Sequence, residues 1–150
     1  MAGSNQIIPE KIHLNQIKWI SANTAISEET FPIQPTYDFV IAYNMMHNLE
    51  KKIVKIRLYV DMHGIISKKI VNQGGNYEVD FIFQIDNLEE HYQFIDEKPV
   101  FNGMLVATLL GISFSTLRGM LISLWKDTKL SNVIPPVISV PELLKSKRQQ

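Results

Sequence analysis

The residue types that most often carry chemistry are scattered in this sequence and form no recognisable motif. The histidines lie far apart, without HxH, HxxxH or HExxH spacing, at His13, His47, His63 and His91. A metal site would have to assemble several such donors from distant parts of the chain, and the spacing predicts none. We expect these histidines to be solvent-facing residues of strands and turns.

Groups that could act as nucleophiles or as general acids are equally isolated. There is no GxSxG or SxxK motif, and Ser113 and Ser115 fit the start of a helix better than a catalytic role. Adjacent carboxylates occur at Glu28-Glu29 and Glu89-Glu90, where neighbouring loop side chains point apart. Gly74-Gly75 lacks the following Lys-Ser/Thr pair of a phosphate loop. The sequence therefore predicts a non-enzymatic protein with no catalytic residue, metal or cofactor.

Composition narrows the class of protein further. The 150 residues include 15 Lys+Arg, 15 Asp+Glu and no Cys, and 45% are hydrophobic. This length fits one domain, residues 1–150, with a core that needs no disulfide. The balanced charge gives no excess positive field for nucleic acid. Met1–Glu10 lacks the pattern of a secretory signal and no apolar run is expected to approach the roughly 20 residues that span a bilayer, so we expect no membrane insertion and a cytoplasmic location.

Alternating apolar residues predict strands in the first half of the chain. Within Ile12–Trp19 the apolar side changes phase, which indicates a strand with a bulge. Odd positions are large over Tyr37–Met45, and even positions are apolar over Val54–Met62. With a turn at Asn48–Lys51 these two runs predict an antiparallel hairpin. Ser27–Pro35 fits neither period and is interpreted as a long connection.

Two glycine positions compete for the next hairpin turn. Gly64 precedes one apolar run, and Gly74-Gly75 precedes the alternating run Tyr77–Ile85. Glycine supplies the positive φ that tight hairpin turns require, so either position could turn the chain, and the other would then be a bulge in one long strand. The residue pattern predicts four or five strands and leaves this choice open.

The pattern changes to helices after an acidic segment, Asp86–Glu97. Met104–Leu110 predicts a short helix stopped by Gly111. Ser113 is the expected N-cap of a longer helix that ends near Lys129, whose charge suits a helix C-terminus.

The C-terminal part is expected to be extended over Leu130–Val140 and to end in an amphipathic helix opened by Pro141. Strands followed by helices predict an α+β domain with helices on one face of an antiparallel sheet. The chain has more apolar residues than one sheet face covered by helices would bury. They belong either to a thick core or to a surface for oligomerisation or for an apolar client.

Three stretches carry a family resemblance. The run ISFSTLRGMLISLWKDTKLSNVIPPVISVPELL, Ile112–Leu144, combines an aromatic-led helix, an early arginine, a Pro-Val pair and a final helix. VNQGGNYEV, Val71–Val79, is a Gln-Gly-Gly element followed by an aromatic strand position. In this order, after a first strand at Ile12–Ile26, they resemble the bacterial export chaperone SecB family. The matching positions are Phe114, Arg118, Leu121, Leu124, Pro136, Val137, Leu143, Leu144, Gln73, Gly74, Gly75 and Tyr77.

The resemblance implies a SecB-like fold, a four-stranded antiparallel sheet with two or three helices packed on one face. It places a tight hairpin at Gly64 and a kink at Gly74-Gly75 within the fourth strand. It also implies a homo-oligomer, a dimer of dimers, with the helix Phe114–Asp127 between dimers. The interface residues it nominates are Phe114, Leu117, Leu121, Leu124 and Trp125.

The same resemblance implies that unfolded polypeptide is bound in long apolar grooves. By position, the polypeptide-binding residues would be Phe31, Pro32 and Ile33 in the connection, and Leu143 and Leu144 in the last helix. No nucleotide site is visible, so holding of clients without ATP follows.

Two departures bear on the partner. Just before the Gln-Gly-Gly element, where the family offers a carboxylate to the translocation motor, this chain has Lys68-Lys69-Ile70-Val71, and its acidic segment Asp86–Glu97 is longer. These departures argue against docking to the motor. We therefore expect an ATP-independent SecB-like chaperone for unfolded preprotein or for a dedicated client such as an antitoxin. The alternatives are a non-catalytic oligomeric adaptor for one folded partner and a small-ligand-binding domain.

Overall fold

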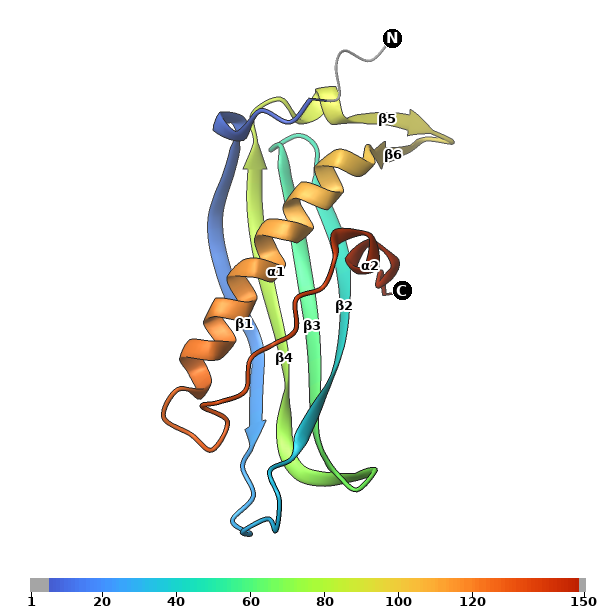
Figure 1. Ribbon diagram of the computed structural model, residues 1–150. Coiled ribbons are helices and arrows are strands. Elements are labelled where there is room, and N and C mark those ends of the chain that lie inside the picture. Colours follow the sequence, from blue (N-terminus) through green and yellow to red (C-terminus); the bar gives the residue numbers. More distant parts are fainter. Residues whose placement is uncertain (1–5, 149–150) are drawn as a thin grey trace.

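Four long antiparallel strands form the largest part of the computed structural model, which describes residues 6–148 (Figure 1). The strands are β1 (Ile12–Ala25), β2 (Thr36–Asn48), β3 (Ile53–Ile66) and β4 (Lys69–Ile85), preceded by a 3-10 turn, Pro9–Lys11. Their order in the sheet is β1-β4-β3-β2. Two α-helices follow, so the predicted α+β fold with a four-stranded antiparallel sheet is confirmed.

The first two predicted strand features are present. The pairing of β1 with β4 shifts register between Leu14 and Gln16, where the bulge was expected, and again between Trp19 and Ser21. β2 and β3 pair without interruption from Asn48↔Ile53 to Thr36↔Ile65, which confirms the predicted hairpin.

The glycine at the end of β3 does not turn the chain, so the implied tight hairpin at Gly64 is wrong. The turn lies at Ser67 and Lys68, which adopt φ values of 51° and 65°. Gly64 is buried within β3 and pairs with Val71, whereas its neighbour His63 pairs with Gly74. The pairing of β3 with β4 therefore skips two residues of β4, Asn72 and Gln73. The irregularity that the resemblance implied at Gly74-Gly75 lies at this point of β4.

Gly74 is required by close backbone packing. Its φ is 157°, and a Cβ at this position would press on the carbonyl oxygen of Met62 in β3. We expect Gly74→Ala to destabilise the protein by about 2–4 kcal/mol because the backbone of β3 would have to move. Urea unfolding followed by circular dichroism measures this loss.

Gly119→Ala is the matched control, since Gly119 lies exposed in a helix with nothing within 4 Å of its virtual Cβ. Helix propensity predicts a gain of about 0.5–1 kcal/mol for this change. Equal unfolding midpoints for the two variants would contradict the role assigned to Gly74.

One continuous helix, α1 (Gly103–Trp125), replaces the two helices expected from the sequence. Gly111 does not stop it, and Ser113 does not cap it. The Ser113 hydroxyl donates to the carbonyl of Leu109 at 2.8 Å, the back-bonding pattern of a serine inside a helix. The cap is Asn102, whose side-chain oxygen accepts from the Leu105 amide at 2.8 Å.

The core lies between α1 and the facing side of the sheet. The inward residues of the helix and of the two central strands are all fully buried, namely Leu105, Leu109, Leu117, Leu121 and Trp125 of α1, Val54, Ile56, Leu58 and Val60 of β3, and Val79, Phe81 and Phe83 of β4. By length and composition alone α1 could cross a membrane, which corrects the expectation that no apolar run is long enough. In this structure one side of the helix packs on the sheet.

A second, two-stranded sheet is a feature that the sequence analysis missed. After a short turn, Leu88–His91, the chain forms β5 (Tyr92–Ile95) and β6 (Lys98–Phe101), a hairpin that extends away from the end of the large sheet (Figure 1). Its turn residues Asp96 and Glu97 have φ values of 52° and 66°. Part of the acidic segment is therefore ordered as an arm.

Candidate polypeptide-binding surface

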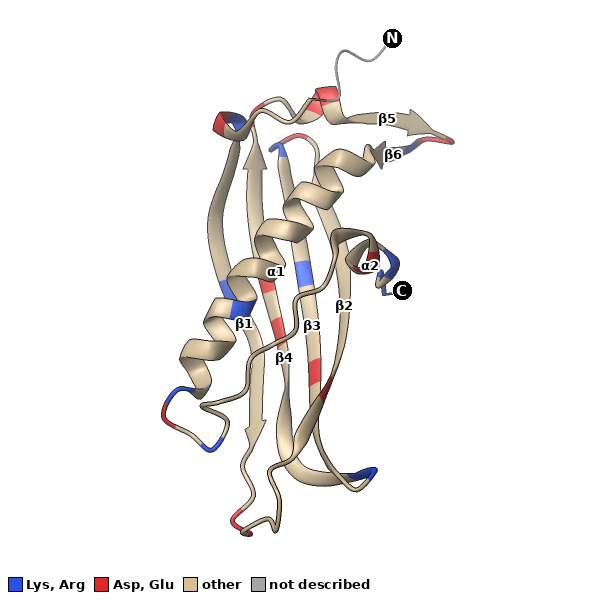
Figure 2. Cartoon of the chain, in the orientation of Figure 1, with Lys and Arg blue, Asp and Glu red and all other residues tan. Residues whose placement is uncertain are grey.

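Charged residues lie at the middle of β3 and β4 (Figure 2). They alternate with the fully buried residues of β3 that face α1, so they lie on the opposite, outer face of the sheet. The Arg57 guanidinium donates to both carboxylate oxygens of Asp80, at 2.6 and 2.8 Å. Lys55 lies 3.6 Å from Asp80, and Glu78 lies 3.8 Å from Arg57. These charges satisfy one another, so this part of the face is not a site for apolar polypeptide.

Asp80 has only 3% of its surface exposed, yet it stays ionised. Burial by itself would raise its pKa, but the hydrogen bonds and charge of Arg57 and the charge of Lys55 outweigh burial and lower the pKa. A carboxylate held in this state has neither the proton nor the raised basicity of a general acid or base.

Exposed apolar residues concentrate instead on the helix side of the sheet. α1 runs diagonally across this side (Figure 1). The connection from residue 126 to 139, which begins with turns and has no regular secondary structure from residue 133, and α2 (Val140–Lys145) run beside it. On the connection, Ile134 is 66% and Val137 83% exposed, whereas Pro135 between them is buried. The connection thus presents large apolar side chains to solvent from a backbone that is fixed to the core.

Arg118 of α1 is one of the groups that fix the connection. Its Nε and one terminal nitrogen donate to the carbonyl oxygen of Pro135, at 3.2 and 3.1 Å. Two hydrogen bonds from one planar guanidinium to one acceptor define the position of that peptide group. The arginine of the family-like motif is therefore a positioning residue for Ile134 and Val137.

Removing this arginine is expected to release the connection. We expect Arg118→Ala to increase hydrogen–deuterium exchange at least tenfold in the hydrogen-bonded amides of Ser131 and Val133, because the loss of two charge-assisted hydrogen bonds removes about 1.5–3 kcal/mol of local stability. Lys126→Ala, an exposed cation at the end of the same helix, is the control. Identical exchange in this segment for both variants would show that Arg118 does not hold it.

The long connection between β1 and β2 forms a second apolar element. Phe31 is half-buried, and Pro32 and Ile33 are exposed, Ile33 by 58%. They line an open hollow of about 330 Å³ together with Gln73 and Lys129. The predicted residues of this connection thus do lie together on the surface.

Gln73, the first residue of the Gln-Gly-Gly element, anchors this second element. Its side-chain oxygen accepts from the Ser27 amide at 3.3 Å, and its amide nitrogen donates to the Tyr37 hydroxyl at 2.9 Å. Lys129 Nζ donates to the Ser27 carbonyl at 2.6 Å. Gln73 of β4 therefore ties both ends of the connection, and Lys129 ties the Ser27 end to the segment after α1.

The last helix contributes less than expected. Leu143 is buried, with 2% exposed, and belongs to the core, while Leu144 is half-buried. Leu143 also lines a separate hollow of about 330 Å³ with Ile41 and Ile138. Leu143 is therefore almost closed to a client, whereas Ile134 and Val137, which the sequence analysis did not nominate, are exposed.

The residues that follow α2, as far as Arg148, are held on the edge of the sheet. Tyr43 of β2 donates its amide to the Ser146 carbonyl at 3.2 Å and accepts from the Arg148 amide at 2.7 Å. The Arg148 guanidinium lies 4.2 Å from the centre of the Tyr59 ring. These contacts seat α2 against β2.

The residues predicted to lie between protomers divide into two groups. Phe114, Leu117, Leu121 and Trp125 are at most 5% exposed and pack in the core of their own chain. These four residues are three or four positions apart in α1, so they lie on one side of the helix, the side that faces the sheet. Only Leu124 points away, with 44% exposed. An interface on α1 would therefore use the exposed sides of the helix, which also carry Met104, Ile112 and Ile122.

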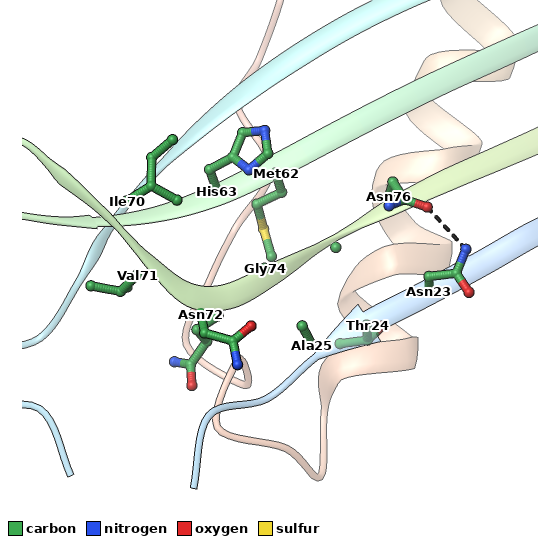
Figure 3. A pocket seen from close by; sticks show the side chains of 12 residues that line it. Asn23, Thr24, Ala25, Met62, His63, Ile70, Val71, Asn72, Gly74 and Asn76 are labelled. Atoms are coloured by element: carbon green, nitrogen blue, oxygen red, sulfur yellow. Dashed lines mark hydrogen bonds between the residues drawn. The ribbon is translucent and has the colours of Figure 1, made fainter. Parts of the chain in front are cut away.

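A hollow of about 530 Å³ lies where β4 is irregular (Figure 3). Amides dominate its polar lining, and the Asn23 amide already donates to Asn76 at 3.0 Å (Figure 3). His63 is exposed beside it, whereas His91 is buried, contrary to the expectation for the histidines. Within residues 6–148, no three His, Asp or Glu side chains are grouped as metal ligands.

Comparison with known proteins identifies the fold. No family model matches the chain, and no curated protein matches it in sequence. Among solved structures it is similar to the Rv1957 SecB-like chaperone of Mycobacterium tuberculosis, determined in complex with a ChAD peptide from the Rv1956 HigA1 antitoxin. The two share 12% identity with a TM-score of 0.61, over 87% of this chain and 93% of the other. The chain therefore has a divergent SecB-like fold.

Proposed function

We propose that this protein is an ATP-independent SecB-like chaperone that holds unfolded or extended polypeptide and catalyses no reaction. The observation that carries the proposal is a pair of anchored apolar elements, Ile33 on the connection between β1 and β2 and Ile134 with Val137 on the connection after α1. Large apolar side chains held in the open by hydrogen-bonded backbone are typical of interaction surfaces.

Burial of apolar area would provide the affinity. Covering about 100 Å² of apolar surface at each of several side chains contributes roughly 2.5 kcal/mol per side chain, at about 25 cal/mol per Å². Such contacts have little directionality, so many client sequences can use them. No nucleotide is needed, because release follows from the modest affinity of each contact and from refolding of the client.

A dedicated client is the partner we favour. The SecB-like chaperone of similar fold was determined with an antitoxin peptide. In this chain the exposed pair Lys68-Lys69, where the turn leads into β4, is basic where the export chaperones present a carboxylate to their motor, so docking to that motor is not part of the proposal. A cytoplasmic location fits this role.

We also propose a homo-oligomer, a dimer of dimers. β1 lies at one edge of the sheet and pairs only with β4, over Ile12–Ala25. Ile17, Trp19 and Ile20 are each about 40% exposed along it. A free edge of this length with apolar residues is normally covered. The outer face of α1, with a hollow of about 780 Å³ along it, is a second surface of the same kind.

Suppression of aggregation tests the proposed function. The wild-type protein is expected to keep several unrelated, reduced and unfolded polypeptides soluble without ATP. The double change Ile33→Asp with Val137→Asp is expected to weaken binding of such a polypeptide at least tenfold, because two carboxylates replace exposed apolar contacts. Light scattering and fluorescence titration measure both effects.

The control is Val40→Asp, because Val40 is 59% exposed on the outer face of the sheet, away from the proposed surface. This variant is expected to bind as the wild type does. Loss of binding in the control, or full binding by a folded double variant, would place the client elsewhere. A wild-type protein that suppresses no aggregation would refute the chaperone proposal.

A further inference from the structure

The β5–β6 arm is closed at its base by a buried histidine. His91, the last residue of the turn before β5, is 2% exposed. Its carbonyl oxygen accepts from the Asn102 amide at 2.8 Å, and its Nδ1 lies 3.0 Å from the side-chain nitrogen of Asn102. These two residues flank the arm in the chain, on either side of Tyr92–Phe101. Because an isolated two-stranded hairpin is marginally stable in water, the order of the arm depends on this closure.

The cap of α1 determines which nitrogen of His91 carries the proton. The side-chain oxygen of Asn102 accepts from the Leu105 amide at 2.8 Å and so fixes the orientation of the Asn102 side chain. Its nitrogen, which can only donate, then faces Nδ1 of His91. Nδ1 must accept this bond, so the imidazole is neutral, with its proton on Nε2. The Asn102 side chain thereby joins the start of α1 to the base of the arm.

A second proton on His91 would break this connection. It would set an N–H of the ring against the N–H of Asn102 and leave a buried donor without an acceptor. The imidazolium would also lie at the N-terminal end of α1, where the dipole of a 23-residue helix disfavours positive charge. Burial lowers the pKa of His91 from its ordinary value of 6.5, although the charges of Glu90 and Glu89 oppose this shift.

The two carboxylates of the same turn have other partners. Glu90 accepts from the Asn87 side chain at 2.7 Å, and Glu89 lies 3.5 Å from Lys52, with the charge of Lys11 also acting on it. Among the described residues, neither carboxylate forms an ion pair with His91. They therefore favour a charged imidazole only from a distance.

The neighbouring elements provide no carboxylate that would stabilise the charged ring. An open hollow of about 180 Å³ beside His91 is lined, from β5, β6 and the residue before α1, by Tyr92, Gln93, Val100, Phe101 and Asn102. From β2, exposed His47 packs against the Phe101 ring at 5.4 Å. The hollow gives solvent protons a route to His91 without unfolding of the core.

We propose that His91 is a pH-sensitive switch, which holds the arm to the cap of α1 when neutral and releases it when protonated. Because the folded state disfavours the second proton, the stabilising contact is fully present above the ordinary pKa of 6.5 and is lost progressively as the pH falls below it. Release frees the Asn102 side chain, so the first turn of α1 and the strands of the arm loosen together. The switch does not require the chaperone function.

Amide hydrogen exchange at about pH 7.5 and about pH 5.5, corrected for the intrinsic pH dependence of exchange, tests the switch. The reporters are the amides of Asn102 and Leu105, which are bonded to the His91 carbonyl and to the Asn102 side-chain oxygen. Their protection is expected to be about three- to tenfold lower at the acidic pH, the effect of one histidine about one unit below its ordinary pKa.

Two variants separate the imidazole from other effects of pH. His91→Gln is expected to remove the response, because a glutamine oxygen can accept from Asn102 and does not titrate. Asn102→Asp is expected to reverse it, since a carboxylate still caps the helix but pairs with a protonated Nδ1, so protection of the Leu105 amide rises as the pH falls. The controls His13→Gln and His47→Gln change exposed histidines and are expected to respond as the wild type does.

An NMR titration of the His91 ring in the wild-type protein gives a readout that needs no variant. We expect a proton on Nε2 alone at neutral pH and a titration midpoint below 6.5. Equal protection at the two pH values, a response that His91→Gln retains, or a midpoint at or above 6.5 would each overturn the switch. None of these outcomes bears on the binding of unfolded polypeptide, so the chaperone proposal stands or falls independently.

Discussion

The packing of α1 on one face of the sheet is the contact on which the rest of the structure depends. The helix is a single rod of 23 residues that crosses the sheet diagonally (Figure 1). It cannot cover the whole face, so the segment after it returns along the uncovered half. From residue 133 that segment forms no helix because Pro135 and Pro136 exclude one there, and it leaves Ile134 and Val137 in solvent. The candidate surface is therefore formed by the same segment that covers the part of the sheet face that α1 leaves open.

The opposite face of the sheet explains why binding is expected on the helix side only. Arg57 and Asp80 form a bidentate pair that is largely removed from water, and pairs of this kind are costly to break from one side. A client that bound to this outer face would therefore gain little binding free energy. On the helix side Arg118, Gln73 and Lys129 hold backbone groups with side-chain hydrogen bonds, so that apolar side chains can remain exposed without collapse of the segments that carry them.

Sequence patterns predicted the sheet well, because alternation over nine residues, as in Tyr37–Met45, Val54–Met62 and Tyr77–Ile85, directly reflects one buried face. These patterns failed where one residue type, glycine, occurs in several kinds of local structure. Gly64 suggested a turn, but it serves close packing beside the bulge, while Ser67 and Lys68 adopt the left-handed turn. Gly111 suggested the end of a helix. Instead, buried residues before it (Leu110) and after it (Ser113) belong to one continuous helix, α1. At the site, Phe31, Pro32 and Ile33 could be nominated by resemblance, whereas the burial of Leu143 and the exposure of Val137 depend on tertiary packing that no local pattern contains.

The most direct measurement of the central claim is hydrogen–deuterium exchange of the wild-type protein, with and without a saturating reduced and unfolded polypeptide. The account predicts slower exchange of the amides in residues 131–138 and in the connection from 28 to 34 when the polypeptide is bound. It predicts unchanged exchange around Val40, at the outer face. Bound polypeptide with no protection in either segment, or with protection confined to the outer face of the sheet, would contradict the account.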